Sequence, residues 1–427
     1  MDYFTVEGGK RLRGEILPSG SKNEALPAIA AALLTDEEVV LDNCPDIKDV
    51  RIMLSIVQTL GAEVEIKDKH KVRIRARNLK DGVVDAKLGR RIRASILLAG
   101  PLLARLGHVN MPPPGGDVIG RRRLDTHFDV FRSLGASLSL GQTYEMKFTT
   151  RPTGKKIFMD EQSVTATENA IMTAILANGT TVMENAAGEP SIQGLANMLN
   201  SMGAKIYGAG TNRLEIHGVE KLHGTTHRIG GDYLEAASYA ALAAVMGDGV
   251  LIRDFPLHKL GKMGYVFNKL GIRLEQRETD CFVPGNQELV IQSDLHSAIP
   301  SIDDAPWPQF PTDLMSIAIT TATQTRGNII FFEKMYDGRM FFVDTLINMG
   351  ARIIPCDPHR VVVVGPSRLM PTSMETPDIR AGMALLIAAL IAEGKSEIRN
   401  INQIDRGYEA IENKLRSLGA DITRVSS

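Results

Sequence analysis

One pattern of apolar and polar positions occurs six times along this chain. An apolar stretch with helical spacing ends in Leu or Met, followed by Gly, then Ala or Ile, then a run rich in β-forming residues. The glycines are Gly61, Gly135, Gly203, Gly271, Gly350 and Gly419, with spacings of 74, 68, 68, 79 and 69 residues. Glycine directly after the last apolar residue is a usual helix C-terminal cap, so each copy predicts a helix end followed by a strand. Such a recurring period predicts six copies of one αβ unit that stack on one another.

The sixth copy illustrates the predicted unit. Residues 384–392 predict a helix, Gly394 a turn, residues 396–398 a strand and residues 408–418 a second helix. Each copy then reads as helix, strand, helix and strand pair. This order predicts an α/β fold in which helices pack against sheets.

The length of 427 residues predicts two domains of three copies each. We expect an N-terminal domain at residues 22–229 and a C-terminal domain made of residues 1–21 and 230–427. The chain would cross near residues 19–21 and again near residues 228–232. Two crossings without a flexible linker favour domains that hinge around a cleft.

The first 20 residues do not belong to the first copy. Tyr3–Val6 and Gly14–Leu17 predict two strands on either side of a turn at Gly8 and Gly9. We expect this hairpin to complete the C-terminal domain.

Composition narrows the class of protein. Hydrophobic residues make up 44% and charged residues 23%, as in soluble globular proteins, and the net charge of −1 gives no general attraction to nucleic acid or anionic membranes. The scattered Cys44, Cys281 and Cys356 argue against a disulfide framework or a zinc site and favour a reducing compartment. The longest apolar stretch, Ala381–Ala392, is too short to span a bilayer, and no signal peptide is visible. These features predict a cytoplasmic protein.

Two segments near the N-terminal domain could bind anions. Ser19–Asn23 opens a helix, and backbone N–H groups beside Lys22 would suit an anion, although a plain Ser cap with a solvated Lys is an equal alternative. Pro112–Arg123 combines prolines, glycines and three consecutive arginines, a composition that suits phosphate. Asp117 lies inside this loop, and the alternative is a solvated basic surface loop.

Three further segments place charged residues at helix starts. Asp304–Asp313 ends on a carboxylate that could cap a helix, as could Thr312, or serve as a base. Arg380 and Arg406 each precede or open a helix, an unfavourable place for a cation unless an anion is present. The alternative is an internal Asp–Arg pair, which we favour for Asp405 and Arg406.

Several of these blocks, in this order, resemble the UDP-N-acetylglucosamine enolpyruvyl transferases from end to end. They are Ser-Gly-Ser-Lys-Asn at 19–23, Arg-Ala-Ser at 93–95, Gly-Gly-x-x-Ile-Gly at 115–120, Ala-Thr-Glu-Asn at 166–169, Phe-Pro-Thr-Asp at 310–313 and Ile-Asp-Arg-Gly-Tyr at 404–408. The resemblance implies the enolpyruvyl transferase fold, a two-domain inside-out α/β barrel of six βαβαββ repeats in two pseudo-threefold domains, with the active site in the cleft.

The resemblance also implies the reaction. The 3-hydroxyl of UDP-N-acetylglucosamine attacks C2 of phosphoenolpyruvate, C3 gains a proton, and the tetrahedral adduct then loses phosphate, which is the first committed step of peptidoglycan synthesis. Neither a metal nor an organic cofactor is implied. The partners are the two substrates, with no nucleic acid, no membrane insertion and no obligate protein partner.

Roles carry over to matched positions. Lys22, Arg122 and Arg380 would hold phosphoenolpyruvate, Asp313 would be the base for the hydroxyl, and Asp117 would act on C3. Nucleotide-sugar contacts are implied for Asn23, Arg93, Arg122, Arg123, Leu124, Asp125, Thr126, Ser163, Val164, Thr165, Asp313, Met335 and Arg339. Asp232 and Glu235 match polar positions between the domains and would assist closure.

This chain departs from the family pattern at four positions. Asp117 stands where Cys is usual, Arg123 where Pro is usual, and Glu161 and Thr165 where Lys and Gly are usual near the diphosphate. Fosfomycin alkylates the family's loop Cys, and a carboxylate is a poorer nucleophile than a thiolate, so we expect resistance to this drug.

Three alternative functions remain. The sister enzyme 5-enolpyruvylshikimate-3-phosphate synthase shares the fold and mechanism but lacks the mobile Gly-Gly-Asp-Val-Ile-Gly-Arg loop. An inactive binding homologue would explain Asp117, yet Lys22, Arg122, Asp313 and Arg380 are all present. Nucleic-acid binding by residues 121–123 fits poorly with the near-zero net charge.

Overall fold

Strands in the computed structural model, which describes residues 2–116 and 119–426, form six separate sheets. The described residues divide into two compact units. We call residues 20–116 and 123–230 the N-terminal unit, and residues 2–19, 119–122 and 231–426 the C-terminal unit. Each unit contains three of the six sheets.

The N-terminal unit contains seven helices and eleven strands among its described residues. The helices are α1 (Lys22–Ala31), α2 (Lys48–Thr59), α3 (Ala86–Gly89), α4 (Ala99–Leu106), α5 (Asp125–Ser133), α6 (Val164–Ala174) and α7 (Pro190–Ser201). The strands are β3 (Glu38–Asp42), β4 (Glu63–Asp68), β5 (Lys71–Arg75), β6 (His108–Met111), β7 (Ser137–Leu140), β8 (Tyr144–Lys147), β9 (Lys156–Phe158), β10 (Thr180–Glu184), β11 (Lys205–Tyr207), β12 (Arg213–His217) and β13 (Thr225–Arg228).

The C-terminal unit has six helices and twelve strands among its described residues. The helices are α8 (Tyr233–Met246), α9 (Lys262–Lys269), α10 (Met315–Ala322), α11 (Val343–Asn348), α12 (Ile379–Ile391) and α13 (Ile411–Ser417). The strands are β1 (Tyr3–Gly8), β2 (Leu12–Ile16), β14 (Gly247–Ile252), β15 (Glu275–Arg277), β16 (Asp280–Val283), β17 (Ser301–Asp303), β18 (Gly327–Phe332), β19 (Ile353–Asp357), β20 (Arg360–Gly365), β21 (Ser373–Glu375), β22 (Gly394–Arg399) and β23 (Asp421–Val425).

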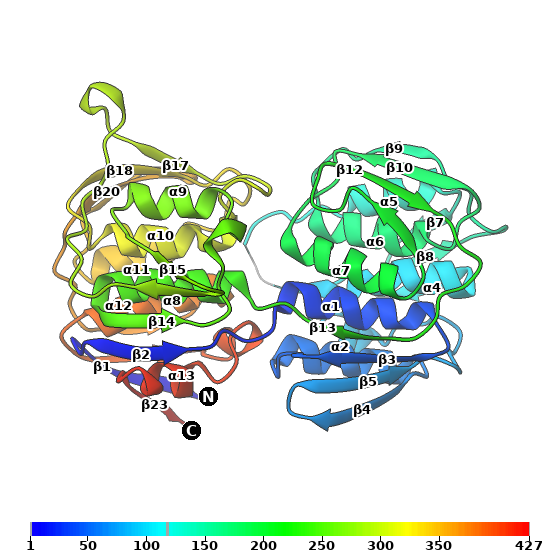
Figure 1. Cartoon of the computed structure of the whole chain (residues 1–427), viewed down its shortest axis with the longest axis horizontal. Helices are drawn as coiled ribbons and strands as arrows, with labels where there is room; N and C mark the ends of the chain where they lie inside the picture. Colours follow the sequence, from blue (N-terminus) through cyan, green and yellow to red (C-terminus); the bar gives the residue numbers. More distant parts are fainter. Residues whose placement is uncertain (1, 117–118, 427) are drawn as a thin grey trace. The chain divides into compact units, whose positions relative to one another are not determined.

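Five sheets share one strand plan. An outer strand runs parallel to its neighbour, and the other two strands are antiparallel, in the orders β13-β3-β5-β4, β9-β10-β12-β11, β2-β14-β16-β15, β17-β18-β20-β19 and β21-β22-β1-β23. The sixth sheet, β6-β8-β7, has a parallel bridge from Val83 to Asn110 in the place of the outer strand. Figure 1 shows one sheet of the plan, where β3, β4, β5 and β13 lie beside α1 and α2. The six-fold repeat predicted from the glycine pattern is confirmed.

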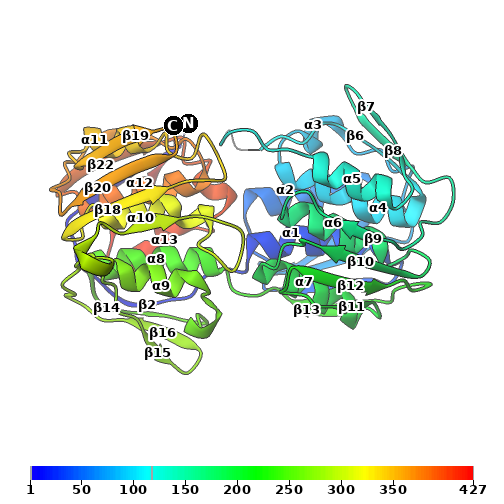
Figure 2. The same cartoon turned by 90° about the horizontal axis from the view of Figure 1, so that it is seen from above.

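Buried helices lie inside the sheets of each unit. In the C-terminal unit α8, α10 and α12 contact one another, and nearly all of their residues are buried (Figure 2). Helices this apolar on every side belong in a core, with the sheets outside them. Hence the α/β architecture is inside-out in its arrangement of layers.

All six repeat glycines follow a helix in the same way. Each has a left-handed φ between 75° and 103°, which L side chains rarely adopt. After α2, the N–H of Gly61 donates to Gln58 O and the N–H of Ala62 donates to Val57 O. This hydrogen-bond pair is a Schellman cap, and it recurs at Gly135, Gly203, Gly271, Gly350 and Gly419. The predicted glycine caps are confirmed.

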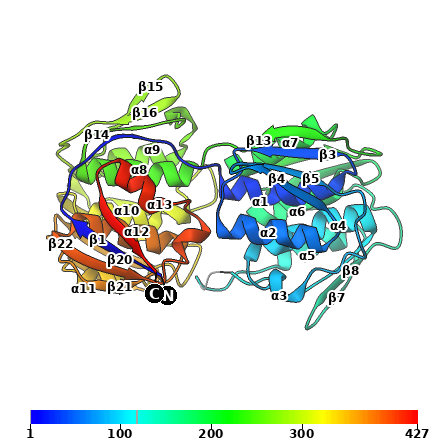
Figure 3. The ribbon, with the colours of Figure 1, turned by 90° about the horizontal axis from the view of Figure 1, so that it is seen from below.

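The N-terminal strands exist, but the predicted hairpin is wrong. β1 lies between β22 and β23, antiparallel to both, whereas β2 is parallel to β14 in another sheet. Figure 3 shows blue β1 among the orange and red strands of the C-terminal unit, with both termini beside it. The strand plan explains the error, because β22 and β23 require a strand between them.

The sixth copy also differs from its prediction in detail. Its first helix is longer, beginning at Ile379, and Gly394 begins β22 rather than forming a turn. The second predicted helix, over residues 408–418, is shorter: α13 covers Ile411–Ser417 and begins after Ala410, whose φ is 45°, and a short 3₁₀ turn at Ile404–Arg406 precedes it. Among the described residues, every helix is too short or too polar to cross a membrane.

Candidate functional site

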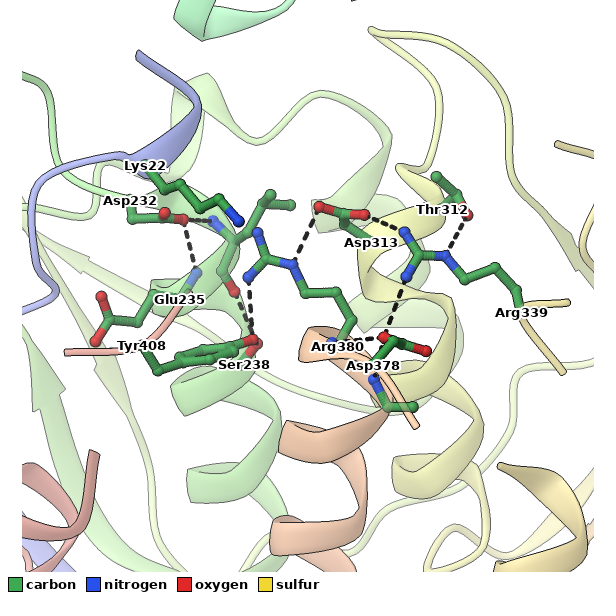
Figure 4. Close-up of polar contacts among 12 residues, drawn as sticks. Lys22, Asp232, Glu235, Ser238, Thr312, Asp313, Arg339, Asp378, Arg380 and Tyr408 are labelled. Atoms are coloured by element: carbon green, nitrogen blue, oxygen red, sulfur yellow. Dashed lines mark hydrogen bonds and ion pairs between the residues drawn. The ribbon is translucent and has the colours of Figure 1, made fainter. Parts of the chain in front are cut away.

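Asp313 is held between two arginines in the C-terminal unit (Figure 4). It lies in a 3₁₀ turn, Thr312–Leu314, directly before α10. Arg339 Nη2 donates to Asp313 Oδ1, and Arg380 Nε donates to Asp313 Oδ2 at 3.1 Å. Two guanidinium groups, one on each oxygen, fix the plane of the carboxylate.

Arg380 occupies the second position of α12 and is only 5% exposed. Its Nη1 donates to the Tyr408 hydroxyl at 3.1 Å. Asp378 caps the same helix by accepting the backbone N–H groups of Arg380 and Ala381 at 2.8 and 3.0 Å. Burial lowers the pKa of the Arg380 guanidinium, but Tyr408 and Asp313 outweigh this effect and raise the pKa well above its ordinary value. Arg380 is therefore a buried, permanently charged group.

Arg339 completes the cluster from the segment that follows β18. Its Nη1 lies 3.4 Å from Asp378 Oδ1, and its Nε donates to the Thr312 hydroxyl at 3.3 Å. Burial lowers its pKa, whereas Asp313 and Asp378 raise it by more. The cluster thus joins two arginines and two carboxylates.

Two sequence-based alternatives for these residues are wrong. Asp313 and Thr312 do not cap α10, whose N-cap position is Leu314, because their side chains turn toward Arg339 instead. Asp405 does not pair with Arg406. Its carboxylate accepts from Arg424 Nη1 and Nη2 at 3.0 and 2.6 Å, since β23 brings Arg424 beside the 3₁₀ turn.

Asp232 and Glu235 lie at the start of α8. Asp232 caps the helix through the N–H groups of Leu234 and Glu235, both at 3.0 Å. The buried Glu235 carboxylate accepts from the Ser19 N–H at 2.8 Å and from Lys414 at 2.6 Å. These contacts hold Ser19, the last residue of the first segment of the C-terminal unit, against the start of α8.

Lys22 is the first residue of α1 in the N-terminal unit, with Asn23 next to it. Its Nζ pairs with Asp49 Oδ2 at 2.8 Å, and the Lys22 side chain is 12% exposed. The alternative of a capping Ser with a solvated Lys is wrong, because the N-cap residue, Ser21, makes no side-chain hydrogen bond to the helix. The ion pair orients the Lys22 ammonium.

The predicted glycine-rich loop packs closely on the segment before Arg93. A Cβ atom at Gly115 would lie 1.8 Å from Arg90 O, and one at Gly116 would lie 2.8 Å from Arg93 Cβ. Only glycine fits such close approaches. Asp117, the predicted acid of this loop, lies outside the described residues.

Residues 119–122 belong to the C-terminal unit. The N–H of Gly338 donates to Ile119 O at 3.1 Å, and the Arg122 guanidinium lies 6.0 Å from the centre of the Tyr336 ring. This part of the loop therefore packs on the segment that carries Met335 and Arg339.

Seven of the predicted nucleotide-sugar contacts lie at the starts of two neighbouring helices in the N-terminal unit. Arg123, Leu124, Asp125 and Thr126 enter α5, and Ser163, Val164 and Thr165 enter α6. Arg123 pairs with Asp125 at 3.0 Å and Asp160 at 3.3 Å. The hydrogen bond between Asp125 and Arg123 raises the pKa of Arg123.

A buried histidine connects these two helix starts. His127 Nδ1 is 2.9 Å from Asn169 Nδ2, and His127 Nε2 is 3.0 Å from Thr165 Oγ1. Burial lowers the pKa of His127 to about 3, so the ring is neutral. Because the amide nitrogen can only donate, Nδ1 accepts and Nε2–H donates to Thr165.

The structure thus brings the predicted residues together in two groups. Arg122, Asp232, Asp313, Met335, Arg339 and Arg380 belong to the C-terminal unit; Lys22, Asn23, Arg93, Arg123, Leu124, Asp125, Thr126, Ser163, Val164 and Thr165 belong to the N-terminal unit. Sequence reasoning missed Asp49, His127 and Glu333, which contact these residues. No sequence pattern singles them out: Asp49 follows Lys48, His127 follows Thr126, and Glu333 precedes Lys334. In the part of the chain described, no three His, Cys, Asp or Glu side chains form a metal-binding group.

Comparison with known proteins gives a consistent result. The family described as EPSP synthase (3-phosphoshikimate 1-carboxyvinyltransferase) matches residues 6–415. UDP-N-acetylglucosamine 1-carboxyvinyltransferase from Borreliella burgdorferi is 51% identical over 427 residues, covering 100% of both chains. The protein of the same name from Bradyrhizobium diazoefficiens is 51% identical over 422 residues, covering 99% of this chain and 98% of the relative.

Two solved structures share the fold. The enolpyruvyl transferase NikO from Streptomyces tendae matches with a TM-score of 0.88 at 23% identity, covering 100% of this chain and 99% of NikO. EPSP synthase from Acinetobacter baumannii matches with a TM-score of 0.77 at 16% identity, covering 100% of each chain. The predicted enolpyruvyl transferase fold is confirmed.

Proposed function

The chain belongs to the UDP-N-acetylglucosamine 1-carboxyvinyltransferases, within the wider EPSP synthase family, and on this premise we propose how its residues act. The enzyme transfers the enolpyruvyl group of phosphoenolpyruvate to the 3-hydroxyl of UDP-N-acetylglucosamine and releases phosphate. This reaction begins peptidoglycan synthesis. The three free cysteines support a reducing, cytoplasmic location.

Asp313 is the proposed base for the sugar hydroxyl, and its fixed carboxylate is the observation that carries the assignment. Arg339 and Arg380 each engage one of its oxygens. A carboxylate oxygen has two acceptor sites, so an oxygen paired with a guanidinium still suits a hydroxyl proton. Preorganised geometry of this kind is what general-base catalysis requires.

The cations have a separate proposed role. Phosphoenolpyruvate carries a phosphate and a carboxylate, and Arg380, Arg122 and Lys22 would bind these anionic groups. The buried Arg380 is always charged, so its attraction for an anion is screened less than that of a surface residue. Arg380 would thus stabilise the charge that develops as the adduct forms.

The proton balance follows from these roles. Asp313 takes the proton of the 3-hydroxyl as the hydroxyl oxygen bonds to C2, while Asp117 gives a proton to C3. In the second step C3 returns a proton to Asp117, the C2–O bond to phosphate breaks, and the phosphate leaves with the proton that Asp313 had taken, which restores the base. Asn23, Arg93, Arg123, Leu124, Asp125, Thr126, Ser163, Val164, Thr165, Met335 and Arg339 are proposed to hold the nucleotide sugar, with Asp232 and Glu235 supporting closure.

The first experiment measures phosphate release from phosphoenolpyruvate with UDP-N-acetylglucosamine or shikimate-3-phosphate as acceptor, for the wild type and Asp117→Ala. Release with the nucleotide sugar only, lost in the variant, supports both the function and the role of Asp117. Release with shikimate-3-phosphate would instead identify the sister activity. No release with either acceptor would favour a binding homologue.

A further inference from the structure

Two buried carboxyl groups lie side by side behind the Asp313 cluster. Asp304 directly follows β17, and Glu333 directly follows β18. These strands are parallel neighbours, with Asp303 opposite Phe332, so the two carboxyls leave the sheet at one edge. Both residues are 0% exposed.

The backbone and Thr312 supply the donors to Glu333. Its Oε1 accepts the N–H groups of Met335 and Tyr336 at 3.1 and 3.0 Å. Its Oε2 accepts the Thr312 hydroxyl at 2.8 Å. Glu333 therefore holds both the segment that leads to Arg339 and the residue before Asp313.

Asp304 lacks one donor. Its Oδ1 accepts the Lys334 N–H at 2.5 Å, but its buried Oδ2 has no hydrogen-bond donor among the described residues. The register of β17 and β18 places Asp304 beside Glu333, and the N–H on Asp304 Oδ1 comes from the residue directly after Glu333, so the two carboxyls are neighbours. Ionised carboxylates only accept, so the contact becomes a hydrogen bond only when one of them carries a proton.

The neighbouring cations are engaged elsewhere. Arg339 binds Asp313 and Asp378. Lys334 and Lys262 both bind Asp303. His359 Nε2 lies 3.4 Å from Asp337, and Arg360 binds Asp357. His359 Nδ1 contacts only the backbone carbonyl of Glu333, at 2.8 Å. A second negative charge on the pair would therefore be poorly compensated in this dry setting.

We propose that Glu333 is protonated and donates to the unpartnered Asp304 Oδ2, and that this carboxyl pair positions Thr312 and Arg339, and through them the Asp313 carboxylate. The Thr312 hydroxyl transmits the effect, because it donates to Glu333 and accepts from Arg339 Nε. Asp304 and Glu333 are positioning residues, and neither is proposed to touch substrate. The part that concerns catalysis rests on the proposed function.

The acid–base properties of the pair agree. Burial raises the pKa of Glu333 to about 8, helped by the hydrogen bond and the charge of Asp304, while Thr312 and Arg339 lower it. The native state retains the Glu333 proton between the ordinary carboxyl pKa and about 8, where the unfolded chain has lost it. Stability therefore falls as pH rises through this window.

Asp304→Asn is the decisive variant. Its amide oxygen can accept the Lys334 N–H, and its amide nitrogen can donate to Glu333 without a titrating proton. Asp303→Asn is the matched control. It removes the same charge from the preceding residue, whose side chain is partly exposed. Thermal unfolding midpoints from pH 5 to 9.5 and the pH profile of kcat/KM would be measured for both variants and the wild type.

We expect the unfolding midpoint of the wild type and of Asp303→Asn to fall with pH relative to that of Asp304→Asn. For the wild type, kcat/KM should be about tenfold below its plateau at pH 9, one unit above the Glu333 pKa of about 8, while Asp304→Asn should keep its plateau there. Glu333→Gln should lose more activity at pH 7 than Asp304→Asn. The amide nitrogen of the new Gln side chain would face N–H or O–H donors whose hydrogen bonds the Glu333 carboxyl accepts.

Other results would overturn the proposal. Identical pH slopes of unfolding for the wild type and Asp304→Asn would show that Glu333 holds no proton for Asp304. An equal shift in Asp303→Asn would show a general effect of charge. If the wild type releases no phosphate at any pH, the proposed function fails, yet the unfolding measurement still tests whether Glu333 is protonated.

Discussion

At the scale of single residues, paired charges determine what each candidate side chain can do. In the C-terminal unit, two guanidinium groups hold Asp313. In the N-terminal unit, Asp49 holds Lys22. Each ion pair involves a partly or fully buried group, so loss of one partner leaves a costly charge. Ion pairs of this kind fix the orientation of a reactive group, whatever they add to stability.

Asp313→Asn should lower kcat by about 10²–10⁴-fold, because an amide cannot take the hydroxyl proton. The exposed Asp344 also lies in the first turn of a helix, so Asp344→Asn is the matched control and should keep wild-type kcat. Steady-state phosphate release measures both variants. A loss of less than threefold in Asp313→Asn would remove Asp313 from the role of base.

Asp117 leads to a prediction about inhibition. The wild type should keep its activity after incubation with fosfomycin, and Asp117→Cys should lose activity with time, because a thiolate opens the drug's epoxide far faster than a carboxylate does. Activity after timed incubation, with the mass of the protein measured in parallel, tests this. Rapid inactivation of the wild type at low drug concentration would contradict it.

At the scale of elements, one helix of each repeat ends in the same way. Six helices end with a left-handed glycine and the same pair of hydrogen bonds. The residue after the glycine is Ala or Ile, whose apolar side chain accompanies such caps. A short local motif therefore sets where each of these six helices ends and where the strand after it begins.

Gly135→Ala tests this cap without creating a clash. No atom lies within 4 Å of the position a Cβ would take, so only the φ of 103° opposes the substitution. We expect the free energy of unfolding to fall by about 1 kcal/mol. Gly141 has equal space but no left-handed φ, and Gly141→Ala should leave stability unchanged or slightly raised. Urea denaturation of both variants measures the difference, and equal values would refute the strain argument.

At the scale of the whole molecule, the fold depends on pairing between the chain's two ends. β1 is an interior strand whose neighbours, β22 and β23, are about 400 residues away in sequence. Phe4 and Val6 point into the core from this strand. The last sheet of the C-terminal unit is therefore complete only when both ends of the chain have folded.

Phe4→Ala should lower the free energy of unfolding by about 3–5 kcal/mol, as a large buried aromatic is removed from the core. Thr5, on the opposite face of the same strand, is the matched control, and Thr5→Ala should cost less than about 1 kcal/mol. Denaturant unfolding monitored by circular dichroism would compare them. Similar small effects for both would mean that β1 contributes little to the core.

The sequence by itself determined what local patterns encode. The six helix ends follow from apolar spacing and glycine, because both act within one or two turns. The family, the reaction and the positions of Asp313 and Arg380 follow from short ordered blocks. Asp117 stays a prediction from the sequence.

Only the tertiary structure decided the contacts between distant segments. It placed β1 and β2 in different sheets, gave Asp405 to Arg424 rather than to its neighbour, and joined Asp304 to Glu333. Strand partners and buried ion pairs depend on which segments pack together, and no local pattern in the chain carries that information.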